Sequence, residues 1–347
     1  MICSARSVVS CVGTVCLLLA LAGCSSRGGG GGLGTGGDND FPDLIGGGDG
    51  GAGNGNTNGG GNGNNNGGGG ETVICNKMDI LFVIDNSGSM GEEQANLASN
   101  FPKFIEVLND FRAENGEALD YRIGITTTSV SASLQQPAII PGFPPTTVPI
   151  TGDDGRLLQA ASCGMKGKWI SSTDGDVANT FACAAKVGTE GSGIEMHFKA
   201  VDLALTDRVG DGSNAGFLRD DALLAVVMLS DEDDCSHVQD PISFDPLSTA
   251  TCPAGQLIGG AELASTLDQV KGDRSRWAAA VIAGPAGANK CSSDFGDADP
   301  GNRLESFITV VGKNGIMSSI CDGDLSAGLL DAVSTFDEAC QAFVPVL

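Results

Sequence analysis

The stretch MDILFVIDNSGSM, residues 78–90, decides the fold of this chain. Its first part, 78–84, is an almost continuous apolar run of residues that favour strands. Such a run predicts a strand buried on both faces, as in the middle of a parallel sheet. A turn of Gly and Ser follows, and from Leu97 to Leu108 apolar residues recur at helical spacing, which predicts a helix over 92–111. Strand, turn and helix together form the first unit of an α/β domain.

The same alternation continues to the end of the chain. Residues 131–152 interrupt it with a Pro-rich segment, which predicts an irregular loop. A capping box of Ser192 and Glu195 predicts the start of one helix. The predicted strands are 121–127, 168–170, 222–229, 277–283 and 315–317, and the further predicted helices are 192–205, 260–271 and 325–343. We therefore expect an α/β fold over 73–347, with a doubly wound, mostly parallel central sheet flanked by helices.

The N-terminal segment has the pattern of an export signal. Arg6 provides a positive charge, and the apolar run over 8–22 is too short to span a bilayer comfortably. The run ends in Leu-Ala-Gly-Cys24, which resembles the lipobox of bacterial lipoproteins. That resemblance implies that residues 1–23 are removed as a signal peptide and that a lipidated Cys24 anchors the protein to a membrane. The neutral Ser25 implies, by the same resemblance, the outer membrane or the cell surface.

Residues 24–72 are rich in Gly and Asn after the predicted lipid anchor. A segment of this composition cannot bury enough apolar surface to offset the entropy lost on ordering. As a Gly-rich coil of about 50 residues it would reach about 40 Å. We expect a disordered tether that holds the folded domain, residues 73–347, away from the membrane.

The chain is strongly acidic, with 43 Asp and Glu against 19 Lys and Arg and a formal net charge of −24. This charge repels nucleic acid and anionic lipid, which excludes both as electrostatic partners. Contact with a membrane is therefore expected only through the lipid anchor. The same charge favours divalent cations.

Eight cysteines lie beyond the predicted signal peptide and Cys24. An even number in an exported protein predicts four disulfides that staple the loops. A zinc site is the competing interpretation, but the chain has no Cys-x-x-Cys pair and only two histidines, His197 and His237. Pairing neighbours along the sequence, and then the two cysteines that are left, predicts Cys163–Cys183, Cys235–Cys252, Cys291–Cys321 and Cys75–Cys340.

The turn after the first predicted strand carries the chemistry. Asp85, Ser87 and Ser89 place one carboxylate and two hydroxyls at the carboxyl end of a central strand, where ligands of open α/β sheets bind. These hard oxygen ligands suit Mg²⁺ or Ca²⁺, and Mn²⁺ is possible. Because three ligands do not complete a coordination shell, we expect others from Thr189 and Asp231, which stand near the ends of other predicted elements.

The segment FVIDNSGSM, residues 82–90, resembles the first motif of von Willebrand factor type A (VWA) domains. The resemblance covers roughly residues 76–345 and implies the Rossmann-like VWA fold. It also implies a metal-ion-dependent adhesion site (MIDAS), in which Asp-x-Ser-x-Ser is joined by a distant Thr and a distant Asp. By this resemblance the divalent cation is held by Asp85, Ser87, Ser89, Thr189 and Asp231, and an open position takes a carboxylate from the partner.

Two features depart from the family's pattern. Counted back from Phe198, the usual spacing of the family's Thr points to Ser192 rather than Thr189, so both remain candidates for the metal site. The late Asp231 is followed by the acids of 232–234 rather than by Gly. We expect these acids to be a solvated run, while a preference for Ca²⁺ or a second ion are the alternatives.

The resemblance implies a cell-surface lipoprotein that binds a protein or polymer ligand through a divalent cation. The alternative is a structural or assembly lipoprotein of the envelope, in which the metal only stabilises the loops. We do not expect an enzyme. Ser87 with His197 or His237 could be a nucleophile and a base, but no nucleophile-elbow pattern surrounds Ser87.

Overall fold

The computed structural model describes residues 75–113, 115–138, 142, 144–243, 252–253, 255–323 and 325–343. The predicted signal peptide, the lipidation site Cys24 and the tether over 24–72 lie outside these residues. Within the described ranges, no helix combines the length and the apolar character needed to cross a membrane.

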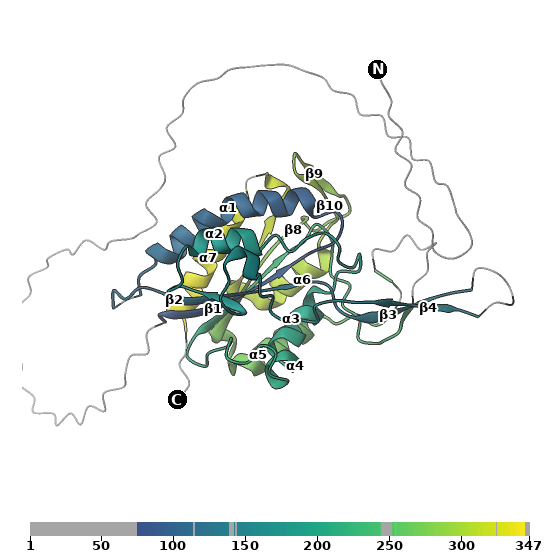
Figure 1. The fold of residues 1–347 in the computed structure, drawn as a ribbon, viewed down its shortest axis with the longest axis horizontal. Coiled ribbons are helices and arrows are strands. Elements are labelled where there is room, and N and C mark those ends of the chain that lie inside the picture. Colours follow the sequence, from purple (N-terminus) through teal and green to yellow (C-terminus); the bar gives the residue numbers. More distant parts are fainter. Residues whose placement is uncertain are drawn as a thin grey trace, which may run out of the picture. The chain divides into compact units, whose positions relative to one another are not determined.

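A six-stranded sheet forms the centre of the domain (Figure 1). From one edge to the other its strands are β11 (Gly315–Ser319), β8 (Trp277–Ala283), β6 (Leu223–Leu229), β1 (Lys77–Ile84), β2 (Asp120–Thr127) and β5 (Trp169–Ser171). Neighbouring strands run parallel, except that the edge strand β5 is antiparallel to β2. β1 lies between β6 and β2 and is buried along almost its whole length, as its apolar run predicts.

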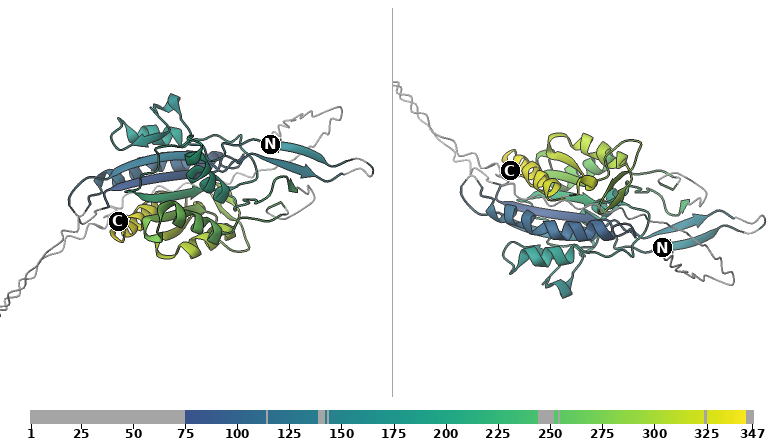
Figure 2. Two further views of the ribbon diagram at one scale, coloured as in Figure 1. Left: turned by 90° about the horizontal axis from the view of Figure 1, so that it is seen from below. Right: turned by 90° about the horizontal axis from the view of Figure 1, so that it is seen from above.

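Helices cover both faces of the central sheet (Figures 1 and 2). One face carries α1 (Gly91–Asp110), α2 (Val177–Ala184) and α7 (Leu325–Gln341), and the other α3 (His197–Leu205), α4 (Asp207–Gly210), α5 (Gly260–Lys271) and α6 (Asn302–Val311). The side chains of β1 alternate between two cores. Phe82 packs against Phe101 of α1 and Phe181 of α2, whereas Val83 belongs to the core that contains Phe198 of α3. The predicted fold class is confirmed.

Two small sheets accompany the central one. β3 (Ala132–Gln136), β4 (Thr146–Ile150) and β7 (Ile242–Ser243) form one that projects from the domain (Figure 1), and β9 (Cys291–Ser293) and β10 (Gly296–Ala298) form a hairpin. The prediction that 131–152 is irregular is therefore wrong. Most prolines of this segment stand between 137 and 145, in the connection of β3 and β4, so they leave most backbone groups of the two strands able to pair.

Helix α3 begins at His197 rather than at Ser192, and the predicted capping box does not form. The N–H groups of Phe198 and Lys199 donate instead to Asp234 Oδ1 at 3.0 Å and to Ser236 Oγ at 2.9 Å. A loop distant in the sequence thus provides the N-terminal caps that local residues were expected to provide. The apolar pattern also gives no prediction of α2, α4 and α6.

All four predicted disulfides are present. Cys75–Cys340 joins the segment before β1 to α7, and Cys163–Cys183 joins the segment before β5 to α2. Cys235–Cys252 links two parts of the loop after β6, and Cys291–Cys321 joins β9 to the turn before α7. Each cross-link restricts the unfolded chain and so favours the folded state.

Candidate metal site

The candidate site lies where β6, β1 and β2 end side by side. Ile84 pairs with Leu229 of β6 and with Thr127 of β2, so the residues that follow these strands meet at one edge of the sheet. The backbone continues this register, since the N–H of Asp85 donates to Leu229 O at 2.9 Å and the N–H of Thr128 donates to Ile84 O at 3.3 Å. Asp85 therefore occupies the middle of the edge.

The side chain of Asp85 is fully buried and held by two hydrogen bonds. Its Oδ1 accepts the N–H of Ser87 at 2.7 Å, and its Oδ2 accepts the hydroxyl of Ser230 at 2.5 Å. The hydroxyls of Ser87 and Ser89 lie 3.0 Å apart in the same turn, Ser87 buried and Ser89 exposed. The first motif thus presents one carboxylate and two hydroxyls within a few residues, as the sequence predicts.

Asp231 lies next to this turn and has an unsatisfied oxygen. It is 3% exposed, and its Oδ1 has no hydrogen-bond partner. Burial, and then the nearby carboxylate of Asp85, raise the pKa of Asp231 to about 6, while the hydroxyl of Ser89 lowers it. The structure therefore brings Asp85, Ser89 and Asp231 together across β1 and β6.

The loop that contains Thr189 is fastened to the first motif by Gln94. The side-chain amide of Gln94 donates to Asp85 O at 2.9 Å and to Gly188 O at 2.8 Å, and its oxygen accepts the N–H of Gly188 at 3.2 Å. Thr189 comes next in this loop and lies near the start of α1. Its methyl group is 3.9 Å from the place that a β-carbon would take on Gly91, the first residue of that helix. Gln94 was not among the predicted site residues.

Ser192, the other candidate for this corner, lies farther along the same loop. Its N–H donates to Ser129 Oγ at 2.9 Å, and its hydroxyl accepts the N–H of Ile194 at 3.0 Å. The hydroxyl is therefore engaged in a local turn beyond the end of β2. Thr189 lies near the first turn of α1, while the N–H of Gly191, the neighbour of Ser192, donates to Asn86 O of the first motif at 2.8 Å, so both residues remain candidates.

Glu195 is a site residue that the sequence analysis missed. It is 1% exposed, its Oε2 accepts the hydroxyl of Thr128, and its Oε1 has no partner. Burial, followed by the carboxylate of Asp85, raises the pKa of Glu195 to about 10. An acid between Ile194 and Met196 was a usable signal, because an isolated carboxylate in an apolar segment needs a specific partner.

Two further acids, Glu93 and Glu232, lie near Asp85 and Asp231. Glu93 in α1 is 4% exposed with an unpartnered Oε2, and burial, followed by Asp231 among the nearby carboxylates, raises its pKa to about 7. Glu232 is half-buried, and burial together with Asp85 and Asp231 raises its pKa to about 7 as well. In the part of the chain that the structure describes, none of these carboxylates is in a salt bridge.

The residues of this edge fit a divalent cation. Unpartnered oxygens of Asp231 and Glu195 are buried beside Asp85, and a cation would compensate their mutual repulsion. Across the described ranges no three His, Cys, Asp or Glu side chains are arranged to hold a metal by themselves. A cation here would therefore also need the hydroxyls of Ser87 and Ser89, which are hard ligands suited to Mg²⁺, Ca²⁺ or Mn²⁺.

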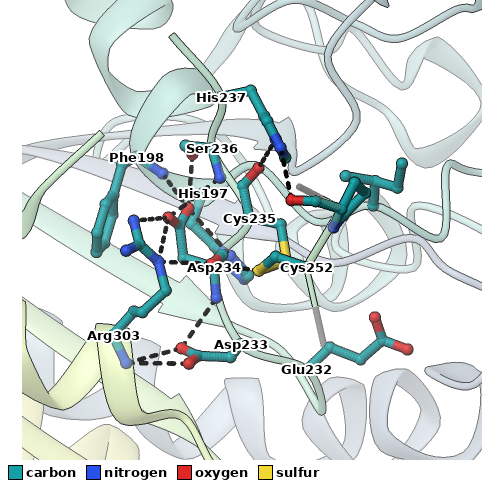
Figure 3. Close-up of a disulfide and its surroundings, with 12 residues drawn as sticks. His197, Phe198, Glu232, Asp233, Asp234, Cys235, Ser236, His237, Cys252 and Arg303 are labelled. Carbon is teal, nitrogen blue, oxygen red and sulfur yellow. Dashed lines mark hydrogen bonds and ion pairs between the residues drawn. A yellow bond between two sulfur atoms is a disulfide. The ribbon is translucent and has the colours of Figure 1, made fainter. Parts of the chain in front are cut away.

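Hydrogen bonds and a disulfide connect the loop after Asp231 to neighbouring elements (Figure 3). Asp234 accepts hydrogen bonds from Arg303 and from the first turn of α3, and Asp233 accepts the N–H of Arg303 at 3.0 Å. Asp233 and Asp234 are 7% and 0% exposed, so the expected solvated run over 232–234 is wrong. These two acids bind backbone and guanidinium donors, while the Cys235–Cys252 disulfide fixes the loop that follows.

Comparison with known proteins identifies no family for the chain. No family model matches the sequence, and no curated protein matches it either. Solved structures with a similar arrangement include proximal thread matrix protein 1 from the mussel byssus, at 11% identity and a TM-score of 0.38, over 77% of this chain and 47% of that one. This chain thus spans about half the length of the mussel protein.

Two other similar structures come from a parasite and a bacterium. Manganese-loaded TRAP protein from Plasmodium vivax has 12% identity and a TM-score of 0.34, over 77% of this chain and 75% of that one. The pilus adhesin SpaC from Lactobacillus rhamnosus GG has 11% identity and a TM-score of 0.37, over 78% and 30%. Similarity at this level does not transfer a ligand or a function to this chain.

Proposed function

We propose that the domain is of the VWA type and binds a partner through a divalent cation at the edge formed by β6, β1 and β2. One observation carries the proposal: Asp85 and Asp231 bury two neighbouring carboxylates, with an unpartnered oxygen on Asp231, beside the hydroxyls of Ser87 and Ser89. Buried carboxylates without a cationic partner are costly, and hard oxygens in this combination suit a divalent ion.

In this proposal the cation is Mg²⁺ or Ca²⁺, and Mn²⁺ is possible. Asp85, Ser87, Ser89, Thr189 and Asp231 hold it, with Gln94 keeping the loop of Thr189 in place. The cation supplies the positive charge that a carboxylate of the partner binds. The protein supplies a fixed arrangement of oxygens, because Asp85 is held by Ser87 and Ser230 on both of its own oxygens.

The partner is a protein or polymer that offers a carboxylate, and the role is adhesion. The sequence of residues 1–72 supports presentation at a surface, since lipidation of Cys24 and a Gly/Asn-rich tether would hold the domain away from the outer membrane. The alternative is an envelope assembly role in which the metal only stabilises the loops. The burial of Asp85, Asp231 and Glu195 favours this alternative, because a bound cation would relieve the repulsion between their carboxylates and so stabilise the fold.

A carboxymethylated dextran surface is a direct probe, because it is a polymer that offers carboxylates. We expect the protein to be retained on it with Mg²⁺ or Ca²⁺ and released by EDTA, and we expect Asp85→Ala to abolish retention with the fold intact. Asp110→Ala, which removes an exposed acid at the far end of α1, is the matched control. Retention of Asp85→Ala like the wild type would refute the cation bridge. Cation-induced stabilisation without any retention would favour the assembly role.

A further inference from the structure

We propose that Asn86 is a positioning residue of the candidate metal site, which together with Ser129 holds the loop over 188–192 in place before a cation binds. The inference rests on the proposed cation site and deepens it, because this loop carries both candidates for the remaining ligand, Thr189 and Ser192. It is carried by hydrogen bonds that attach the loop to the first motif at two points.

The beginning of the loop is attached through Gln94 of α1. Its side-chain amide donates to Gly188 O at 2.8 Å and to Asp85 O at 2.9 Å, and its oxygen accepts the N–H of Gly188 at 3.2 Å. Gln94 is 5% exposed, so water does not replace these partners easily. Gly188 is therefore fixed to the first motif through one buried side chain.

The end of the loop is attached through Asn86, the second residue of the Asp-x-Ser-x-Ser motif. Its carbonyl accepts the N–H of Gly191 at 2.8 Å. Its side-chain Oδ1 accepts the hydroxyl of Ser129 at 2.8 Å, and Ser129 Oγ in turn accepts the N–H of Ser192 at 2.9 Å. Asn86 thus holds two consecutive residues of the loop, one directly and the other through Ser129.

The side chain of Asn86 is also packed closely against the loop. A β-carbon on Gly191 would lie 2.2 Å from Asn86 Oδ1 and 2.4 Å from its Cγ, so a larger residue would displace the loop or the side chain. Ser129 is 2% exposed, which protects its hydroxyl from competition by water. Thr189 stands between the two attachments and Ser192 belongs to the second, so hydrogen bonds of the protein itself set the positions of both.

A loop that the protein itself fixes lowers the cost of binding a cation. Ordering a free loop costs conformational entropy, and a loop that is already held does not pay this cost when the ion binds. Loss of the attachment through Asn86 should therefore weaken cation binding, although it removes none of the proposed ligands.

Hydrogen exchange of the chelator-treated full chain tests whether the loop is held before a cation binds. We expect the amides of Gly191 and Ser192 to be protected in wild type, with little further protection when Mg²⁺ or Ca²⁺ is added. Asn86→Ala and, separately, Ser129→Ala should each accelerate the exchange of both amides about tenfold. The amides of β6 should keep their wild-type rates, because only a loss of global stability would accelerate those too.

Calorimetric titration then connects the loop to the cation. Asn86→Ala should bind Mg²⁺ or Ca²⁺ about tenfold more weakly than wild type. Asn86→Asp keeps an acceptor for the Ser129 hydroxyl and should restore the protection of the loop. Asn100→Ala, which removes a half-exposed amide that bonds within α1, is the matched control and should behave like wild type in both measurements.

Two results would overturn the inference. If the loop of metal-free wild type exchanged rapidly and became protected only with a cation, the ion and not Asn86 would order it. If Asn86→Ala kept the wild-type exchange rates or the wild-type affinity, Asn86 would not position the loop for the cation. Should Asn86→Ala fail to fold, Ser129→Ala gives the same decision, since it breaks the same connection. Wild type that bound neither ion would refute the proposed function instead, and the exchange rates would still show separately whether the loop is attached.

Discussion

Replacing Glu93 by Gln should stabilise the metal-free protein at high pH. Glu93 lies in the first turn of α1 and is 4% exposed, and its Oε2 has no hydrogen-bond partner. Its Oε1 lies against Gly296, where a β-carbon on the glycine would be only 1.8 Å from this oxygen. Burial, and then Asp231 and other carboxylates nearby, raise the pKa of Glu93 from its ordinary 4.5 to about 7. The folded protein must therefore either keep a proton on this group or bear an unfavourable charge.

The sign of the effect follows from proton binding in the two states. Below pH 4.5 Glu93 is protonated in both the folded and the unfolded chain, so it costs nothing. Between pH 4.5 and about 7 the unfolded chain releases the proton first, so stability falls as pH rises, and above about 7 the loss is complete. The pKa of Glu93 is about 2.5 higher in the folded than in the unfolded chain. At about 1.36 kcal/mol for each pKa unit, this difference lowers the free energy of unfolding by about 3 kcal/mol above pH 7.

Urea denaturation at pH 4.5 and at pH 8, in the presence of a chelator, measures this difference. We expect Glu93→Gln to exceed wild type by up to about 3 kcal/mol in the free energy of unfolding at pH 8 and to differ little at pH 4.5. Glu92→Gln, an exposed neighbour in the same turn, controls for the change in net charge. An advantage of Glu93→Gln that stays constant across the pH range would refute the reasoning.

Two further predictions concern the loop beside the site and the closure of the domain. In Gly191→Ala the new β-carbon would lie 2.2 Å from Asn86 Oδ1, so the loop or the side chain of Asn86, which belongs to the first motif, must move. Calorimetry should show weaker cation binding, and urea denaturation should show little change in stability. Unchanged cation affinity would contradict this. Replacing Cys75 and Cys340 together by Ser opens a link across 265 residues and should cost about 5 kcal/mol of unfolding free energy. A loss well below that would indicate that the unfolded chain stays compact without the disulfide.

The central sheet and its main helices could be predicted because their signals are local. A continuous apolar run such as that of β1 is compatible with burial on both faces, and the helices α1, α5 and α7 each carry an apolar stripe. The disulfides followed from the number and order of the cysteines. The first motif was visible for the same reason, since Asp85, Ser87 and Ser89 lie in one short turn.

The missed features depend on contacts between residues far apart in the sequence. The start of α3 is set by Asp234 and Ser236, which no pattern around Ser192 can show. In the same way Glu195 has the sequence pattern of a helix-capping residue. In the structure it is held instead by Thr128 at the end of β2 and by Cys235 in the loop after β6. The spacing of residues in the sequence predicted the turn from Asp85 to Ser89, but it could not predict which residues the ends of β2 and β6 bring next to that turn.

Neighbouring acids in one loop show why the edge of the sheet fits a cation. Asp233 and Asp234 are buried, and each is supplied with donors from Arg303 or from the first turn of a helix. Asp231, only a few residues earlier, is equally buried and keeps an oxygen without a donor, as does the buried Glu195. The fold can thus satisfy buried carboxylates where they support structure. The ones it leaves unsatisfied lie around Asp85, where the positive charge of a divalent ion would offset their repulsion.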